Sequence, residues 1–245
     1  HAMFSLHEDS ASHQEIKDRL LDGGKITGTN MCVLICAMEI ASVGLNTGST
    51  AVIIGAMLIS PLMGSILAMS YATVANDGKL GVKHFLGFLI QIGISLLASS
   101  IYFAISPVKE PTAELLARTS PTFFDVIIAI AGGIAGTIGQ TRKEKANNII
   151  PGVAIATALM PPLCTCGYSL ANARWLMLGM AAYLFIINAY FIYLSGTVIL
   201  GLLKIPKTKE MTAAEWKRKK IRMIRNTLFL MLPSIFLLFK YLNTK

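Results

Sequence analysis

The sequence predicts an all-α, polytopic membrane protein. Of its 245 residues, 54% are hydrophobic and only 14% are charged, and the mean hydropathy is +0.61. An average soluble domain has about 25% charged residues, so this chain has too few charges to cover a surface that faces water. The second observation is a series of seven apolar runs separated by polar, mostly basic segments. Four cysteines are too few for the disulfide framework of a small secreted domain.

The apolar runs define the expected elements and their order. A helix needs roughly 20 residues to cross a hydrocarbon core about 30 Å thick, and the second to sixth runs meet this length. The first run is short, and the seventh, which contains Pro233, either spans the bilayer or lies in its interface. The runs occupy residues 29–45, 50–75, 84–106, 122–140, 148–170, 175–203 and 227–242.

These runs divide the chain into six parts. We expect a cytoplasmic N-terminal segment with an amphipathic helix on the inner membrane surface, two three-helix units joined by an outer loop, a basic linker helix, and a C-terminal seventh helix. The corresponding ranges are 1–28, 29–106, 107–121, 122–203, 204–226 and 227–245.

The distribution of Lys and Arg predicts the orientation. With the N-terminus in the cytoplasm, 17 of the 22 basic residues fall on the inner side, as the positive-inside rule requires. The dense basic stretch within 212–225 begins with a capping box at Thr212 and Glu215. A cationic helix beside the membrane attracts anionic lipid at about 1 kcal/mol per basic residue. We therefore expect the bilayer, with anionic lipid at the inner face, as a partner.

An internal repeat relates the two three-helix units. Residues 52–64 (VIIGAMLISPLMG) align with residues 153–165 (VAIATALMPPLCT) at an offset of 101, which pairs Pro61 with Pro162. A unit of three spans reverses direction, so the halves are expected to be inverted, an arrangement typical of secondary transporters. The alternative is a duplicated protein that transports nothing, because a fold does not imply a function.

The prolines place a candidate site near the middle of the bilayer. Proline has no amide hydrogen, so the carbonyl four residues earlier loses its helical partner. A freed carbonyl in the membrane needs another partner or a hydrated cavity and is able to coordinate a cation or a polar solute. The alternative is a kink that neighbouring helices heal. The residues at the two predicted breaks are Met57, Ser60 and Pro61 in one half and Thr157, Pro161 and Pro162 in the other.

Three further residues belong to this predicted site. Glu39 lies inside an apolar run with no Lys or Arg at its depth, and a carboxylate within the membrane is by default a functional candidate. Its alternative is a protonated Glu that hydrogen-bonds to Asn188, Gln91 or a freed carbonyl. Asn188 offers an amide at a similar depth, or simply joins two helices. Asn46 lies in the polar link 44–50, which lines an outer vestibule or forms a plain turn.

The remaining motifs indicate structure rather than chemistry. Thr122 and Asp125 form a second capping box, and the small residues within 132–139 predict close helix packing. No nucleophile, metal-binding or nucleotide-binding pattern is present, and His84 is expected outside the spans. We therefore expect no enzyme, no metal and no nucleic-acid partner, and the sequence names no cofactor.

Three stretches carry a resemblance to a known family. Residues 44–64 (GLNTGSTAVIIGAMLISPLMG), 118–139 (RTSPTFFDVIIAIAGGIAGTIG) and 151–167 (PGVAIATALMPPLCTCG) resemble domain-of-unknown-function family 389. The resemblance covers about residues 29–203. It implies a multi-pass helical protein of the prokaryotic inner (plasma) membrane, and it names no substrate.

Together these observations predict a transporter or channel for an ion or a small polar solute. Two proline-broken helices and an intramembrane Glu form its site, and the protein is expected to be a homo-oligomer. The alternative function is a sensor or assembly platform that transports nothing and acts through its basic cytoplasmic face.

Overall fold

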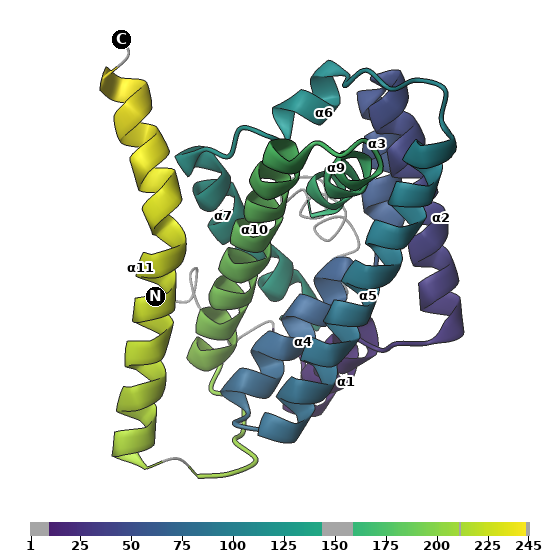
Figure 1. The fold of residues 1–245 in the computed structure, drawn as a ribbon. Helices are drawn as coiled ribbons and strands as arrows, with labels where there is room; N and C mark the ends of the chain where they lie inside the picture. Colours follow the sequence, from purple (N-terminus) through teal and green to yellow (C-terminus); the bar gives the residue numbers. More distant parts are fainter. Residues whose placement is uncertain (1–9, 144–158, 211, 244–245) are drawn as a thin grey trace.

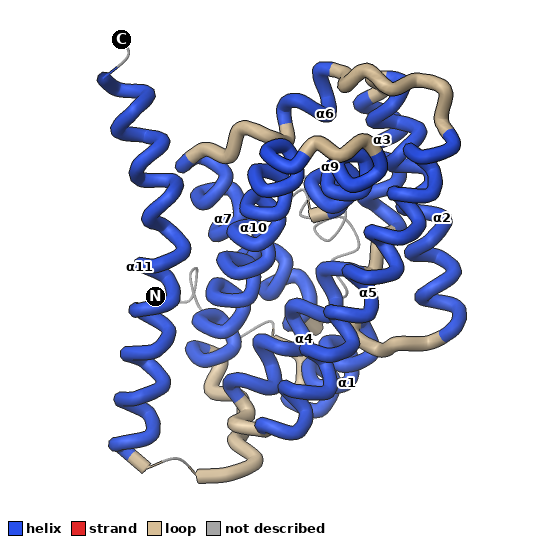
Figure 2. Tube along the Cα trace, viewed as in Figure 1, coloured by secondary structure: helices blue, strands red, loops and turns tan. Residues whose placement is uncertain are grey.

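The computed structural model describes residues 10–143, 159–210 and 212–243 (Figure 1). Within these ranges every regular element is an α-helix, and no strand occurs (Figure 2). Four of the described helices are long and apolar enough to cross a membrane, and a bent helix pair makes a fifth candidate span. The prediction of an all-α protein is confirmed for the described residues, and several of its helices are candidates to span a membrane.

Ten helices are described, and the long ones match the predicted runs. The first, third, fourth and sixth runs each form one continuous helix, whereas the second run is split at Ser60 and Pro61. Of the fifth run, residues 148–158 lie outside the described residues. The bounds are α1 (His13–Gly23), α2 (Gly28–Thr47), α3 (Thr50–Ile59), α4 (Leu62–Val74), α5 (Gly78–Ile105), α6 (Ala113–Ala117), α7 (Phe123–Thr141), α9 (Met160–Ala171), α10 (Trp175–Leu202) and α11 (Ala213–Asn243).

Side chains at the predicted caps fix where the helices begin. Asp125 accepts hydrogen bonds from the amide and the hydroxyl of Thr122 at 2.6 and 2.8 Å, which confirms the capping role predicted for Asp125. At α11, Glu215 accepts the same pair of bonds from Thr212 at 2.9 and 3.1 Å. Both boxes satisfy polar groups that a helix N-terminus leaves without partners.

The two short helices α4 and α9 occupy the centre of the bundle. Each packs against both long helices, α5 and α10, while α7 covers α10 and α2 covers α5 (Figure 1). The rings of Phe88 on α5 and Phe185 on α10 stack with centroids 6.0 Å apart. On α7, a Cβ added to Gly133 would lie 2.9 Å from the Ile192 Cα of α10. The close packing predicted for the small residues of this segment is thus confirmed, within one chain.

The turns that lead into the long helices share one geometry. The Asp77 amide donates to the Ala72 carbonyl at 3.0 Å, and the Arg174 amide donates to the Ser169 carbonyl at 2.9 Å. The residue before each donor, Asn76 or Ala173, has a positive φ of 55° or 52°. All these pairs are 97 residues apart, and α5 and α10 both contain 28 residues. These two connections thus share a spacing of 97 residues, which differs from the offset of 101 that aligns Pro61 with Pro162 in the sequence.

The N-terminal helix α1 packs against protein rather than only against the membrane surface. Its apolar residues Ile16 and Leu20 are buried, and its main neighbour is α4. At its end, Gly23 approaches Gly64 so closely that a Cβ on Gly64 would meet the Gly23 carbonyl oxygen. The apolar face of α1 is therefore part of the protein core.

The last helix α11 runs without interruption through Pro233. Proline has no amide hydrogen to donate, and its ring pushes away the carbonyl four residues earlier. Beside the proline, the Tyr183 hydroxyl of α10 bonds to the next pair of backbone groups: it donates to the Leu230 carbonyl at 2.8 Å and accepts from the Ser234 amide at 3.0 Å. The described part of α11 is not among the candidate membrane spans.

Candidate functional site

The first predicted helix break is present, but its carbonyl is not free. α3 and α4 meet at Ser60 and Pro61 with a bend of 43°. The Ser60 amide donates to the Met57 carbonyl at 3.4 Å, and the Ser60 hydroxyl accepts from the Leu62 amide at 3.4 Å. The tighter turn gives the Met57 carbonyl a new donor in place of the one that Pro61 removes, which agrees with the alternative of a kink that its surroundings heal.

The second pair of prolines begins a helix. α9 starts at Met160 with Pro161 and Pro162 in its first turn, where a missing amide hydrogen costs nothing because that turn has no intrahelical acceptor. Thr157 lies outside the described residues. Both prolines are buried, and the Pro161 carbonyl accepts from the Thr165 hydroxyl at 2.9 Å. Pro161 and Pro162 therefore position the buried start of α9.

A line of polar side chains follows the inward face of α5, and we call it the α5 stripe. It comprises His84, Gln91, Ser95, Ser99, Tyr102 and Ser106. The steps of three, four or seven residues keep these side chains on one face of the helix. All but Tyr102, which is half-buried, are buried. At 1.5 Å per residue the stripe is about 33 Å long, close to the thickness of a hydrocarbon core.

Neighbouring helices pair with the half of the stripe that runs from Ser99 to Ser106. The Asn46 amide of α2 donates to the Ser106 hydroxyl at 2.6 Å and to the Tyr102 hydroxyl at 3.3 Å. One turn further in, the Ser99 hydroxyl accepts from Ser42 at 3.1 Å and donates to the Cys164 carbonyl of α9 at 3.0 Å. Asn46, predicted to line a vestibule, is thus buried at the end of a helical interface.

In the middle of the stripe, two polar atoms have no hydrogen-bond partner among the described residues. The Gln91 Oε1 accepts from the Ser65 hydroxyl of α4 at 2.8 Å, but the Gln91 Nε2 and the Ser95 Oγ, both fully buried, have no hydrogen-bond partner in the described part of the chain. The Asn46 Oδ1 is likewise unpaired there. Buried polar atoms are nearly always paired. These three unpaired atoms therefore indicate that the interior holds more polar groups than are needed to join the helices.

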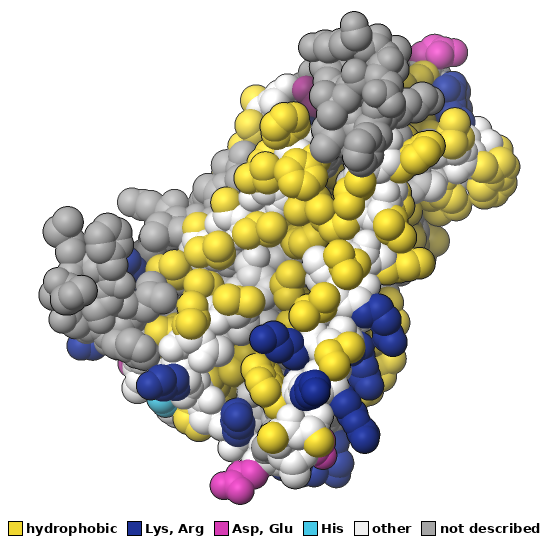
Figure 3. All heavy atoms as spheres, turned by 90° about the vertical axis from the view of Figure 1, so that its left-hand side faces the viewer, with side chains coloured by type: hydrophobic (Ala, Val, Ile, Leu, Met, Phe, Trp, Pro, Cys, Tyr) yellow, Lys and Arg dark blue, Asp and Glu magenta, His cyan; other side chains and the backbone are white. Residues whose placement is uncertain are grey.

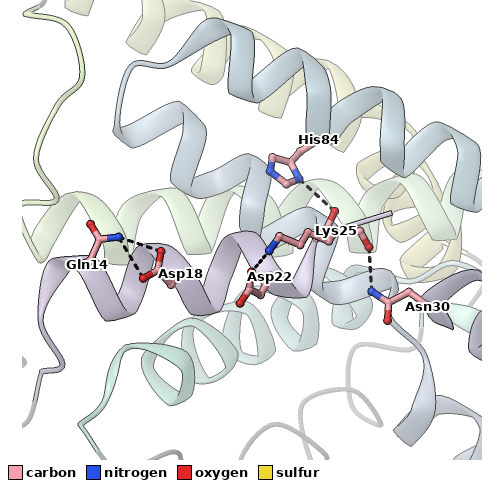
Figure 4. Close-up of polar contacts among 7 residues, drawn as sticks. Gln14, Asp18, Asp22, Lys25, Asn30 and His84 are labelled. Carbon is pink, nitrogen blue, oxygen red and sulfur yellow. Dashed lines mark hydrogen bonds and ion pairs between the residues drawn. The ribbon is translucent and has the colours of Figure 1, made fainter. Parts of the chain in front are cut away.

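The inner end of the stripe is closed by the connection between α1 and α2 (Figure 4). His84 Nδ1 lies 3.2 Å from the Gly24 carbonyl oxygen. The same connection is braced by an ion pair of 2.5 Å between Lys25 and Asp22, and by the Asn30 amide, which donates to the Lys25 carbonyl at 2.9 Å. His84 was expected outside the spans, and it is instead buried within α5.

Glu39 and Asn188 lie on different helices, and no hydrogen bond joins these two described residues. Glu39 is half-buried on α2, forms no hydrogen bond or ion pair with another described residue, and is within electrostatic reach of the buried Cys164 on α9. Asn188 is buried on α10. The part of the chain that the structure describes holds no group of three or more His, Cys, Asp or Glu side chains able to bind a metal.

Sequence reasoning passed over the α5 stripe. The sequence indicates Gln91 only as a possible partner of Glu39, and it does not single out the serines. The available signal was the recurrence of Gln91, Ser95 and Ser99 at intervals of four residues in an otherwise apolar helix, which is the spacing of one helix face.

Comparison with known proteins gives a family. The family described as a domain of unknown function (DUF389) has a sequence model that matches residues 57–194, from the end of α3 to within α10. The uncharacterized protein MJ0678 of Methanocaldococcus jannaschii is 28% identical over 209 residues, which are 85% of this chain. The chain spans 63% of the length of that relative. No solved structure matches.

Proposed function

The chain belongs to the DUF389 family, and from this premise we propose that it moves an ion or a small polar solute across a membrane. The observation that carries the proposal is the α5 stripe. Polar groups buried without partners cost free energy, and in lipid each such group is especially costly. A bundle that served only to anchor other parts would be more stable with apolar side chains at these positions.

The proposed route lies between the two long helices. α4 and α9 both begin inside the bundle and pack between α5 and α10. Interrupted helices near the middle of the membrane are where transporters commonly bind their substrates. The turns with a common register of 97 residues, and the stacked Phe88 and Phe185 at positions with that same spacing, support two related halves. In the proposed inverted repeat α2–α5 form one half, α7–α10 the other, and α11 stands outside.

Each predicted site residue has a place in this proposal. Met57, Ser60 and Pro61 shape the break before α4, and Pro161 and Pro162 set the start of α9, the helix that Thr157 is expected to precede. Asn46 ends the outer half of the α5 stripe, and Asn188 provides an amide from α10. Glu39 is the proposed titratable or cation-binding group, because it is the acidic residue of α2 and reaches toward α9.

The basic end of the molecule supports the proposed orientation and partners. Exposed Lys and Arg side chains gather toward one end of the face that carries α11, and apolar side chains cover the region above them (Figure 3). The exposed basic residues of α11 are Lys217, Arg218, Lys220, Arg222 and Arg225. We assign this end to the cytoplasm of a prokaryotic inner membrane, with anionic lipid against α11. The exposed apolar residues of α11, such as Phe229 and Leu232, suit contact with lipid or with a second copy of the chain.

Flux through proteoliposomes tests the proposal. Current and osmotic shrinkage are measured with imposed gradients of sodium and potassium salts, protons and small neutral solutes. We expect permeation above that of protein-free vesicles, and a loss of ion-driven current in Glu39→Gln. Glu110→Gln, a change in the exposed outer loop, is the matched control and should conduct like wild type. Permeation equal to that of empty vesicles under every gradient contradicts a transport function.

A further inference from the structure

The centre of the α5 stripe presents hydrogen-bond donors with nothing to donate to. Gln91 and Ser95 are one helical turn apart, about 6 Å along the axis, and each is 0% exposed. The Gln91 Oε1 is used by Ser65, which leaves the two Nε2 hydrogens, and the Ser95 hydroxyl has no partner among the described residues. A helical serine can be satisfied within its own helix by the carbonyl four residues earlier, as Ser195 is by Phe191 at 2.7 Å. Ser95 has no such bond.

These donors lie beside the start of a helix. Ser65, which bonds to Gln91, is in the first turn of α4, a helix of 13 residues with no acidic residue in that turn and with one amide, that of Leu62, bonded to the Ser60 hydroxyl. The N-terminus of α9 is buried, with Met160 1% exposed, and it has neither a side-chain cap bond nor an acidic residue in its first turn. A helix N-terminus carries a partial positive charge, which favours an anion.

The ligand class follows from this donor set. Amide N–H groups, a hydroxyl and positive helix ends stabilise negative charge, whereas they offer a metal cation few acceptors and an unfavourable potential. We propose that the Gln91 Nε2 and the Ser95 hydroxyl bind a small anion, of the size of chloride, nitrate or formate, beside the start of α4, where the Ser65 hydroxyl holds the Gln91 amide in place. This site deepens the proposed function, on which it rests, by making an anion the transported solute, but binding itself can be measured without transport.

Thermal stabilisation of the full-length chain in detergent tests the site. Sodium chloride, nitrate or formate replaces gluconate at constant ionic strength, and formamide serves as the neutral counterpart of formate. We expect a saturable rise of the unfolding midpoint with at least one anion and none with formamide. Ser95→Ala should weaken the apparent affinity at least tenfold. Ser195→Ala removes a hydroxyl that is already satisfied within its own helix and should leave the affinity unchanged.

Three results overturn the proposal: no saturable response to any of the anions, equal stabilisation by formamide and formate, or an unaltered anion response in Ser95→Ala. Gln91→Met provides a second variant that removes the amide. Failure of the site is distinguishable from failure of transport. Flux of a neutral solute without anion binding removes the anion assignment alone, whereas anion binding without flux supports the site and contradicts transport.

Discussion

Replacing Gly64 with alanine should displace α1. The Cβ of Gly64→Ala would lie 2.0 Å from the Gly23 carbonyl oxygen and 2.5 Å from its carbonyl carbon. Contacts of a real Cβ atom stay above 3.0 Å, so the end of α1 must move by at least about 1 Å, as close packing requires. Both partners are backbone, which leaves no side-chain rotation able to relieve the clash.

The size of the effect follows from what α1 buries. Overpacking of this kind costs about 1–3 kcal/mol. If α1 were released altogether, the burial of Ile16 and Leu20 would also be lost, at about 1.5–3 kcal/mol for each side chain. The matched control is Gly55→Ala on α3, where an added Cβ meets no atom within 4 Å. That change should stabilise its helix by about 0.5–1 kcal/mol.

The assay is thermal unfolding in one detergent at one scan rate, combined with amide hydrogen exchange of α1. For a chain of this length 1 kcal/mol shifts the midpoint by about 2–4 °C, so Gly64→Ala should unfold about 2–12 °C below wild type while Gly55→Ala unfolds slightly above it. Exchange in α1 should increase only in Gly64→Ala. A midpoint for Gly64→Ala at or above that of Gly55→Ala would refute the contact between α1 and α4.

Two further predictions concern α11. Tyr183→Phe leaves the Leu230 carbonyl and the Ser234 amide without the hydroxyl that joins them. We expect the free energy of unfolding to fall by about 1–3 kcal/mol and amide hydrogen exchange near Pro233 to become faster. Unchanged exchange near Pro233 would count against the bridge. Bonds from Thr212 lower the pKa of Glu215 below its ordinary 4.5. The capping stabilisation is therefore complete above that value and is lost as the pH falls through the lower, folded pKa. Helicity of the first turn of α11 should decline at acid pH in wild type, and Glu215→Gln should show no such dependence.

The sequence predicts the membrane-spanning helices because hydropathy acts over long segments. Capping boxes such as Thr122 with Asp125 were also predictable, since they involve residues close in the chain. The close packing at Gly133 could be expected in kind, although only the fold identifies α10 as its neighbour.

The features that the sequence could not predict depend on which helix faces pack together in the fold. Proline chemistry indicates a lost bond at Pro61, but the recovery of the Met57 carbonyl by the Ser60 amide depends on the local turn. An apolar face on α1 is equally suited to lipid and to protein, and only the position of α4 decides between them. The same limit applies to Gln91, whose buried and half-paired amide is a property of its surroundings.

The position of α1 links the N-terminal segment to the proposed route. Its last residue, Gly23, contacts Gly64 in the first turn of α4. The carbonyl oxygen of the next residue, Gly24, contacts the His84 Nδ1 at the inner end of the α5 stripe. A solute that followed the stripe from Gln91 toward the inner side would therefore meet the connection between α1 and α2. Because that connection packs through glycine backbone, a shift of about 1 Å changes both contacts together. The same Gly64→Ala substitution that tests the packing of α1 should then also alter flux in proteoliposomes, and it should do so without any change to the donors of Gln91 and Ser95.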